Sequence, residues 1–326
     1  MRRTTYTPPR NPLIALILQK NLSFLNWKLA RLLFVFLDGN YLAPHNTMTD
    51  YFAGVDIGST MTKVVIMNQG IISSIIGPTG PEQRRLANKV MEEALNKVEL
   101  PFDAITYVVA TGYGRINVPF ADKQVTEITC HAKGVASIFP GARTVIDIGG
   151  QDSKAIKIDR GRPIDFVMND KCAAGSGRFL EVIADTLGVD IEELGELALK
   201  SKTPVKISNI CTVWAEQEVV ARLAEGTPLD DLIAGIHESL ANRISRMIRR
   251  LNVVEEVVMT GGGAKNIGLV KAFSDKLGYP ILVPPEPLLT GAVGAALLGK
   301  DFVEKARREG LSLEKKERIL EEVKIH

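Results

Sequence analysis

Short apolar runs, glycine turns and longer amphipathic segments alternate from Tyr51 onward. "FAGVDIG" and "KVVIMN" predict two strands joined by the polar turn "GST", and "IISSII" predicts a third strand. "AITYVVATGYG" predicts a strand and a turn between two helices, expected over about Glu82–Val98 and over Lys123–Phe139, the second ended by Pro140. This mixture of strands and helices indicates an α/β fold.

The opening pattern returns in the middle of the chain. "RTVIDIGGQDSKAIKID" repeats the strand–turn–strand order of "GVDIGSTMTKVVIMN". In both, a lysine follows the aspartate of Asp-Ile-Gly by seven residues, as Lys63 follows Asp56 and Lys154 follows Asp147. The repeat covers a β-hairpin, and it predicts two related lobes.

The second half is richer in helices. Helices are expected over about Gly177–Leu187, over Ile191–Lys200, after Cys211, and over Leu229–Leu251, where apolar residues recur at three- and four-residue steps. "VEEVVMTGGGAKN" predicts a strand, a triple-glycine turn and the start of a helix, and "TGAVGAALLGK" predicts a closely packed helix. The charged tail from Asp301 is expected to be a solvated helix.

Residues 1–47 differ from the rest. They carry six Arg or Lys against one Asp, a net charge of +5, while the whole chain carries +2. Their apolar runs, "PLIALIL" and "LLFVFL", fall short of the roughly 18 residues of a membrane span, and no signal-peptide pattern occurs. We interpret this stretch as an atypical extension upstream of a start at Met48, with a membrane-surface anchor as the alternative.

The composition is that of an ordinary globular protein, with 45% hydrophobic and 24% charged residues. It gives no reason to expect a nucleic-acid partner. Three cysteines are too few for a disulfide framework, so a reduced, cytoplasmic setting is expected.

Three glycine turns follow apolar strands, at Gly58, at Gly149–Gly150 and at Gly261–Gly263. Glycine lets backbone N–H groups approach a phosphate closely. Neither a P-loop nor a dinucleotide-binding glycine motif occurs. Around the first turn, hydroxyls and Lys63 can hold phosphate oxygens, and a buried Asp56 calls for a cation such as hydrated Mg²⁺. The alternative is an ordinary hairpin with a polar tip.

The three turns together resemble the actin-like ATPase superfamily of sugar kinases, heat-shock chaperones and actin. The resemblance implies that ATP or ADP with Mg²⁺ lies between two lobes, residues 48–140 plus about 285–326, and residues 141–284. Asp147, Gln151 and Asp152 would face the metal and the attacking water, with Gln151 orienting that water. The residues implied to bind the nucleotide come from the three turns: Asp56, Gly58, Ser59, Thr60, Met61, Thr62, Lys63, Gly149, Gly150, Lys154, Gly261, Gly262, Gly263 and Asn266.

Two cysteines occupy similar settings, because Cys172 and Cys211 each precede a predicted helix. The positive end of a helix favours a thiolate, the form that binds metal. Cys130 is expected in the middle of a helix, so a single chain has half of a four-cysteine site, and a symmetric dimer could complete it for zinc or a [4Fe–4S] cluster. Buried unrelated thiols, a redox disulfide, and zinc held with other ligands remain alternatives.

The motifs "GVDIGSTMTK", "ATGYGR", "ADKQVTEITCHAKG", "TVIDIGGQDSK", "NDKCAAGSGRFLE", "ICTVWAEQEV" and "VVMTGG" resemble the activator (component A) of 2-hydroxyacyl-CoA dehydratases over about Phe52–Gly299. The same ATPase family includes the ATP-binding subunits of benzoyl-CoA reductase. The resemblance implies a homodimer that shares one [4Fe–4S] cluster through Cys172 and Cys211. ATP hydrolysis would change the angle between the helices that follow the cysteines, and would drive an electron from ferredoxin or flavodoxin into a partner iron–sulfur enzyme.

Three other functions stay open. The chain could be the ATP-binding subunit of an aromatic-CoA reductase, an actin-like small-molecule kinase, or a nucleotide-dependent regulatory module. The acyl-CoA substrate of a partner does not enter this chain, so the sequence does not name it.

Overall fold

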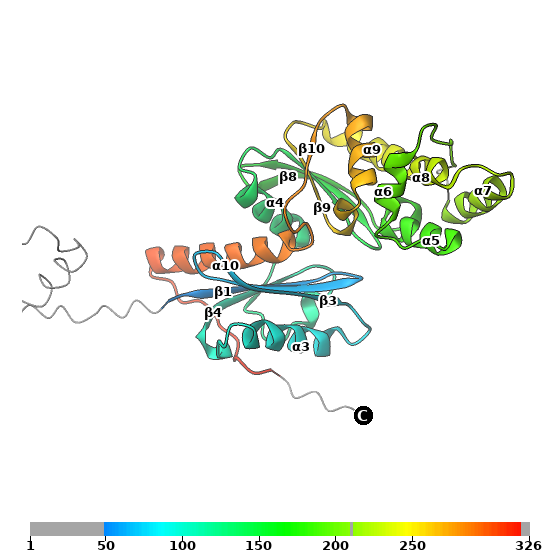
Figure 1. Ribbon diagram of the computed structural model, residues 1–326. Coiled ribbons are helices and arrows are strands. Elements are labelled where there is room, and N and C mark those ends of the chain that lie inside the picture. The colour runs from blue at the N-terminus through cyan, green and yellow to red at the C-terminus, as the bar shows by residue number, and fades with distance from the viewer. Residues whose placement is uncertain (1–48, 209–210, 321–326) are drawn as a thin grey trace, which may run out of the picture. The chain divides into compact units, whose positions relative to one another are not determined.

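The computed structural model describes residues 49–208 and 211–320, so the predicted extension over residues 1–47 lies outside the described residues. The described chain contains two five-stranded mixed sheets, each with helices on both faces (Figure 1). No helix in this part is long and apolar enough to cross a bilayer.

The first sheet has the strand order β3-β2-β1-β4-β5. Strands β1 and β2 and strands β2 and β3 pair antiparallel, while β4 pairs parallel with both β1 and β5. Its strands are β1 (Tyr51–Ile57), β2 (Met61–Met67), β3 (Ile71–Pro78), β4 (Ile105–Thr111) and β5 (Lys123–Gln124).

Both faces of this sheet are covered, which explains why its strands are apolar on both sides. Ala53, Val55 and Ile57 of β1 pack with helix α3 (Gln83–Asn96) on one face. Phe52 of β1 packs with helix α10 (Thr290–Glu309) on the other. Gly54 lies against the α10 backbone, and an added Cβ would lie 2.7 Å from the Ala296 nitrogen. The small residues of "TGAVGAALLGK" therefore let this helix approach the sheet closely, as expected.

The second sheet has the order β10-β9-β6-β7-β8. Strand β7 pairs antiparallel with β6 and β8, while β9 pairs parallel with β6 and β10. Its strands are β6 (Thr144–Ile148), β7 (Ser153–Asp159), β8 (Arg162–Asn169), β9 (Val257–Thr260) and β10 (Ile281–Leu282). Taken in chain order, these strands repeat the pairing and directions of the first sheet, which confirms the two related lobes that the hairpin repeat predicts.

The helices of the second sheet separate onto its two faces. Helix α4 (Glu127–Ile138) packs on one face and also contacts α10. The other face covers the largest apolar cluster of the described chain. The helices that contribute to that cluster are α5 (Gly177–Leu187), α6 (Leu194–Lys200), α7 (Thr212–Ala224), α8 (Leu229–Ile248) and α9 (Ile267–Leu277). Five short 3₁₀ helices complete the described chain: η1 (Phe102–Ala104), η2 (Arg115–Asn117), η3 (Ala173–Gly175), η4 (Arg249–Leu251) and η5 (Gly262–Lys265).

Two predicted elements are wrong in detail. Helix α4 begins at Glu127 rather than at Lys123, because the Thr126 hydroxyl accepts a hydrogen bond from the Thr129 N–H (3.4 Å) and so caps the helix there. Lys123–Gln124 instead pair with β4.

The C-terminal tail is the second difference. Helix α10 ends at Glu309, because Gly310 takes a left-handed conformation, and residues 311–320 have no regular structure. The tail is not wholly solvated either. Arg318 Nη2 lies 2.6 Å from Asp122 Oδ2, and only 9% of the Arg318 side chain is exposed. The predicted helix is therefore present over Asp301–Glu309 and absent after Gly310, where Arg318 docks on Asp122.

Candidate functional site

The first glycine turn joins β1 to β2. Asp56 and Lys63 are register partners, and Lys63 Nζ lies 3.2 Å from Asp56 Oδ2. Asp56 is buried at the strand end, as expected. The Gly58 N–H donates to the Met61 carbonyl at 3.0 Å, which leaves Ser59 and Thr60 at the partly exposed tip of the turn.

Two of the residues predicted to bind the nucleotide lie within β2 rather than at the tip of the first turn. Met61 begins β2, and Thr62 is fully buried, with its hydroxyl 2.8 Å from the Thr79 hydroxyl. The Thr62 hydroxyl therefore ties β2 to the end of β3.

The second glycine turn joins β6 to β7 and repeats this geometry. Asp147 and Lys154 are register partners, with Lys154 Nζ 3.4 Å from Asp147 Oδ2 and 2.8 Å from Asp152 Oδ2. The Gly149 N–H donates to the Asp152 carbonyl (3.0 Å), and Gln151 is exposed at the tip. The turn thus presents an exposed amide above the buried Asp147–Lys154 pair and the partly exposed Asp152 carboxylate.

The two turns meet in space. An added Cβ on Gly150 would lie 2.5 Å from the Thr60 hydroxyl, so the tips of the turns are in contact. Asp147 is held by the Thr260 hydroxyl, which donates to Oδ1 at 2.8 Å. The structure therefore brings together the first and second turns that the sequence predicts as one site.

A histidine that sequence reasoning missed lies between the turns. His131 Nδ1 is 3.8 Å from Asp147 Oδ1 and 3.1 Å from the Thr290 hydroxyl. Next to it, a Cβ on Gly291 would lie 2.8 Å from Asp56 Oδ2 and 3.2 Å from His131 Nε2. His131 of α4 and Gly291 of α10 therefore lie in the space between the Asp56 and Asp147 carboxylates. The only feature of the sequence that could have indicated His131 is "TCHAKG", where a histidine occurs among small residues in a predicted helix.

The surroundings of the second turn favour the charged forms of Asp147 and Lys154. Burial by itself would raise the pKa of Asp147, but His131, Lys154 and the Thr260 hydrogen bond together hold that pKa well below its usual range. Burial would lower the pKa of Lys154, but Asp147 and Asp152 raise it above its usual value. The pair therefore stays ionised at neutral pH.

The third glycine turn lies against the second. Gly261 has a positive φ of 79°, and a Cβ there would come 2.9 Å from Asp147 Oδ1. Gly263 packs on Ile148, while Gly262 faces open space. This turn therefore combines one glycine packed against the carboxylate with one left accessible.

Asn266 ends the third turn and caps α9. Its Oδ1 accepts from the Leu269 N–H at 2.9 Å and lies 3.0 Å from His237 Nε2, while its Nδ2 is buried with no hydrogen-bond partner among the described residues. His237, a second residue that sequence reasoning missed, is 1% exposed, and its Nδ1 lies 2.7 Å from the Ile233 carbonyl. A neutral imidazole carries one N–H, so in either tautomer His237 donates to the Ile233 carbonyl or to Asn266 Oδ1 but not to both.

Cys172 lies in the loop between β8 and α5, partly exposed. It precedes the three-residue η3, and α5 starts only at Gly177 because Ser176 is extended. The helix expected over Gly177–Leu187 is therefore confirmed, and η3 and Ser176 separate it from Cys172. Asn169 Nδ2 holds the loop by donating to the Cys172 carbonyl at 2.8 Å, and Arg243 Nη2 donates to Cys172 Sγ at 3.0 Å.

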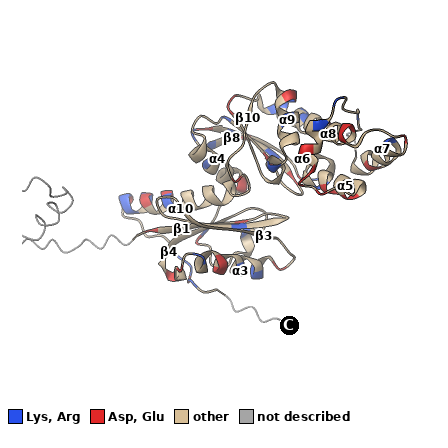
Figure 2. Cartoon of the chain, in the orientation of Figure 1, with Lys and Arg blue, Asp and Glu red and all other residues tan. Residues whose placement is uncertain are grey.

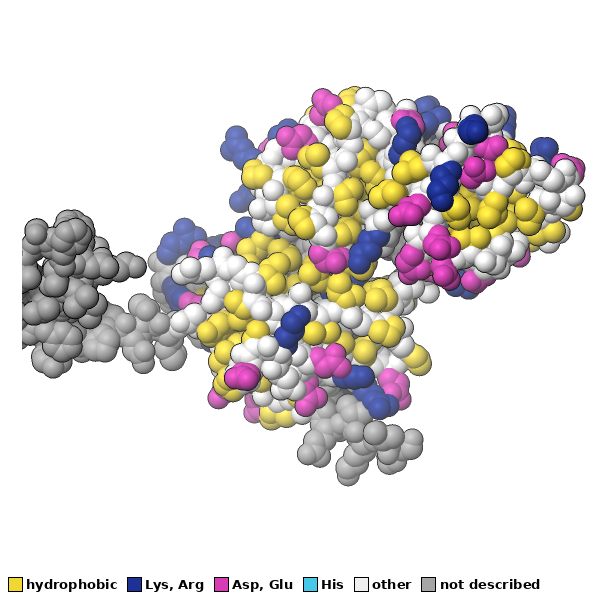
Figure 3. Space-filling view, in the orientation of Figure 1, with side chains coloured by type: hydrophobic (Ala, Val, Ile, Leu, Met, Phe, Trp, Pro, Cys, Tyr) yellow, Lys and Arg dark blue, Asp and Glu magenta, His cyan; other side chains and the backbone are white. Residues whose placement is uncertain are grey.

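Cys211 is the N-cap residue of α7, as expected, and is also partly exposed. Helices α5 and α7 contact each other, so both thiols belong to one part of the lobe. Val213 and Trp214 follow Cys211 and are 61% and 69% exposed. Apolar side chains are visible on the surface of the lobe that carries these helices (Figure 3).

Cys130 contrasts with both. It lies inside α4, fully buried, and burial raises the pKa of its thiol to about 12. All three cysteines are free thiols. Within the described ranges, no group of three or more His, Cys, Asp or Glu side chains is arranged to hold a metal ion.

The second turn is bonded directly to the start of α5. The Gly177 N–H donates to the Gly149 carbonyl at 2.8 Å, and the Arg178 N–H donates to the Gly150 carbonyl at 2.8 Å. The buried Ser153 hydroxyl donates to the Gly175 carbonyl at 2.6 Å. A displacement of the turn therefore acts at once on the loop that carries Cys172.

This doubled sheet–hairpin architecture is that of the actin-like ATPases. A solved ROK family glucokinase from Streptomyces griseus, 13% identical, shares the fold with a TM-score of 0.51 over 77% of this chain and 99% of its own. The fold predicted from the three turns is confirmed. Residues 53–299 match the BadF/BadG/BcrA/BcrD ATPase family, and the chain belongs to that family.

Relatives within the family are much more similar. The 2-hydroxyisocaproyl-CoA dehydratase activator of Clostridioides difficile is 47% identical over 79% of this chain and 98% of its own length. A solved activator of the 2-hydroxyisocaproyl-CoA dehydratase from Clostridium difficile with bound ADPNP is 45% identical, with a TM-score of 0.75 over 81% of this chain and 99% of that one. A benzoyl-CoA reductase subunit of Thauera aromatica is 32% identical over 79% of this chain and 96% of its own length.

Proposed function

We propose that this chain is an ATP-hydrolysing activator that passes a low-potential electron to a partner 2-hydroxyacyl-CoA dehydratase. The observation that carries the proposal is the direct hydrogen bonding of Gly149 and Gly150 to the segment that follows Cys172. The similarity to dehydratase activators over nearly their whole length supports the same function.

ATP or ADP binds between the first and second turns, with the adenosine at the third. Ser59, Thr60 and Gly150 supply N–H and hydroxyl donors to the phosphates, and Lys63 and Lys154 supply positive charge. Gly58 and Gly149 instead shape the turns, because their N–H groups bond to the Met61 and Asp152 carbonyls. The unpartnered Asn266 Nδ2 is available as a donor to the adenosine. Leaving a buried amide donor unsatisfied costs free energy, so an acceptor at this point stabilises the complex.

The carboxylates also suit a hydrated Mg²⁺ held mainly through water, because no three of the described side chains are placed to bind a metal directly. Asp56, Asp147 and Asp152 offer carboxylate oxygens, which together with water are the ligands that Mg²⁺ prefers. Asp147 stays charged because His131 and Lys154 lie beside it. The exposed Gln151 amide orients the attacking water, and a neutral amide does so without adding a further charge to the site.

The thiols fit a [4Fe–4S] cluster shared by two chains. Cys172 and Cys211 are partly exposed, and the described residues offer them no third protein ligand of the metal-binding type. Two thiols from each of two chains make the four that such a cluster requires. When bound, the cluster supplies one-electron redox chemistry. The exposed Val213 and Trp214 beside Cys211 support a contact with another protein at this end of the lobe.

Residues of this chain alone couple the nucleotide site to the segment around Cys172. When the nucleotide changes state, the Gly149–Gly150 carbonyls move α5 through the Gly177 and Arg178 N–H groups, and Ser153 moves η3 through the Gly175 carbonyl. Ferredoxin or flavodoxin is the electron donor, and the dehydratase does the chemistry on the acyl-CoA.

Anaerobic purification tests this function. We expect a brown homodimer with about four iron atoms per two chains and an ATPase activity. A colourless protein that hydrolyses ATP at full rate after iron–sulfur reconstitution would contradict it.

The similarity to the benzoyl-CoA reductase subunit favours a second candidate, the ATP-binding subunit of an aromatic-CoA reductase. Permanent co-purification with other subunits would distinguish that candidate.

A further inference from the structure

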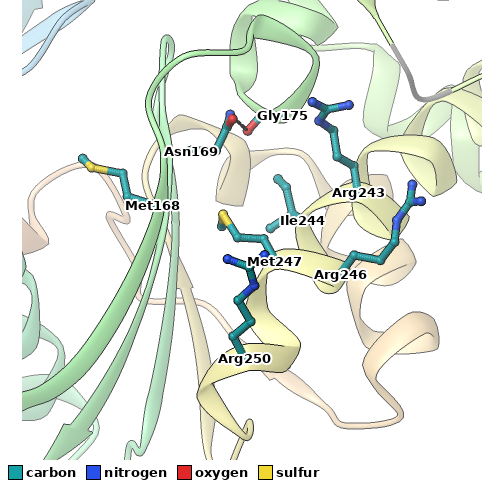
Figure 4. Close-up of a pocket in the computed structure, with 8 residues that line it drawn as sticks. All are labelled: Met168, Asn169, Gly175, Arg243, Ile244, Arg246, Met247 and Arg250. Carbon is teal, nitrogen blue, oxygen red and sulfur yellow. Dashed lines mark hydrogen bonds between the residues drawn. The ribbon is translucent and has the colours of Figure 1, made fainter.

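A row of arginines begins at the Cys172 sulfur with Arg243, continues along α8 with Arg246, and ends with Arg250 in η4, which follows α8 directly. Arg243, Arg246 and Arg250 line an open pocket of about 520 Å³ whose other walls come from the end of β8 and from Gly175 (Figure 4). Steps of three and four residues place side chains on one face of a helix. Seven residues of helix span about 10 Å, so the row is longer than a single phosphate group.

The outer two arginines are exposed and carry no ion pair to any carboxylate of residues 49–208 and 211–320. Arg246 donates Nε to the Asn242 carbonyl at 3.3 Å, which uses one of its N–H groups. Acidic side chains lie instead along α5, α6 and α7 (Figure 2). The row is therefore a local concentration of positive charge.

The dipole at the C-terminal end of α8 does not by itself explain why three arginines lie along this row. The negative end of a helix favours cations within its last turn, which covers Arg246 and Arg249 but not Arg243, further from the end of α8. A small-molecule site is also a poor fit, because ligand pockets are mostly apolar, whereas arginines make up three of the eight residues that line this one. In the proposed homodimer the second copy meets this chain at the cysteines, and it would not cover Arg246 and Arg250 with its own row, because that contact would bring like charges together.

We propose that Arg246 and Arg250 form the docking site for the acidic face of the small redox protein that delivers the electron. The inference rests on the proposed function. Arg243 bonds to Cys172 Sγ at 3.0 Å, so a protein docked on the row lies beside the thiol. Complementary charge speeds the encounter and selects the partner. The row therefore directs the acidic carrier to the part of the surface where electron transfer is shortest.

The test measures binding of an oxidised, acidic flavodoxin to the intact homodimer, followed by flavin fluorescence at low and high salt. Arg246→Glu and Arg250→Glu should each lower the association rate constant about tenfold at low salt and flatten its dependence on salt. Arg249→Glu is the matched control, because Arg249 is exposed on the same helix end but does not line the pocket. It should change the rate constant less than twofold.

Equal losses in all three variants, or no loss in the two pocket variants, would overturn the proposal. Saturable binding of coenzyme A that Arg246→Glu abolishes, with flavodoxin binding unchanged, would also overturn it. Because neither protein is reduced, the measurement does not depend on ATP-driven electron transfer. A homodimer without iron would defeat the proposed function and leave the docking result standing.

Discussion

The Gly149 carbonyl oxygen accepts a hydrogen bond from the Gly177 N–H at 2.8 Å, which joins the second glycine turn to the first residue of α5. The first N–H groups of a helix have no partner within the helix. Here the carbonyls of Gly149 and Gly150 take two of them. The second glycine turn therefore serves as the cap of the helix that follows Cys172, and the turn and the helix cannot move independently without loss of hydrogen bonds.

Ser153→Ala should weaken this connection. Ser153 is fully buried and donates to the Gly175 carbonyl at 2.6 Å, so its loss should lower the free energy of unfolding by about 1 kcal/mol. The ATPase rate should stay within about twofold, while the difference between ATP and ADP in the rate of iron loss to a chelator should shrink. Ser137→Ala removes a similar bond to the Gly134 carbonyl, 2.6 Å long, and is the control. An ATP–ADP difference equal to that of wild type would contradict the coupling.

Cys172→Ala and Cys211→Ala should each abolish bound iron and leave nucleotide affinity within about threefold. The physical reason is that each chain supplies two of the four thiolates of a shared cluster. Cys130→Ala should keep its iron, because Cys130 is buried inside α4 and its raised pKa of about 12 keeps it a neutral thiol. Iron content after anaerobic purification checks all three variants. Iron retained by Cys172→Ala would refute the ligand assignment.

Gln151→Ala should slow ATP hydrolysis by roughly tenfold to a hundredfold with little change in ATP affinity. The side chain is exposed at the tip of the second turn, so its removal leaves the buried Asp147 carboxylate in place. Steady-state phosphate release and equilibrium ATP binding separate the two effects. Gln69→Ala, in the exposed turn between β2 and β3, serves as the control. An unchanged hydrolysis rate would remove Gln151 from the water-orienting role.

His237 should make the folded protein sensitive to acid. Burial lowers the pKa of His237 below its ordinary value of 6.5, against the opposing hydrogen bonds to Ile233 and Asn266. The unfolded chain takes up a proton below pH 6.5 and the folded chain does not, so this group costs no stability above 6.5 and destabilises the fold as pH falls. Relative to His237→Gln, wild type should lose up to about 1.4 kcal/mol per pH unit below 6.5. Denaturant midpoints from pH 5 to 8 check this, and parallel profiles would contradict it.

The hairpins were the part of the fold that sequence could predict. Asp56 with Lys63 and Asp147 with Lys154 are local pairs across a short turn, so their spacing already implies their register. The repeat of the whole strand order could not be predicted from the sequence, because only the hairpins resemble each other while the intervening helices differ.

There is a physical reason why the sequence did not predict His131, which lies between the turns. His131 meets Asp147 and Thr290 through the packing of α4 on α10, segments separated by about half the chain. The contacts of His237 with Asn266, of Arg243 with Cys172 and of Arg318 with Asp122 have the same origin. Such contacts depend on how packed elements meet, and no local spacing encodes them.

The most direct measurement of the central claim is electron transfer from the reduced homodimer to a purified 2-hydroxyacyl-CoA dehydratase, followed anaerobically in one turnover. With ATP and Mg²⁺ present, the dehydratase should become reduced and active, and with ADP, or with Cys172→Ala in place of wild type, it should stay inactive. Reduction of the dehydratase at the same rate with ADP as with ATP, or by the Cys172→Ala variant, would contradict the claim.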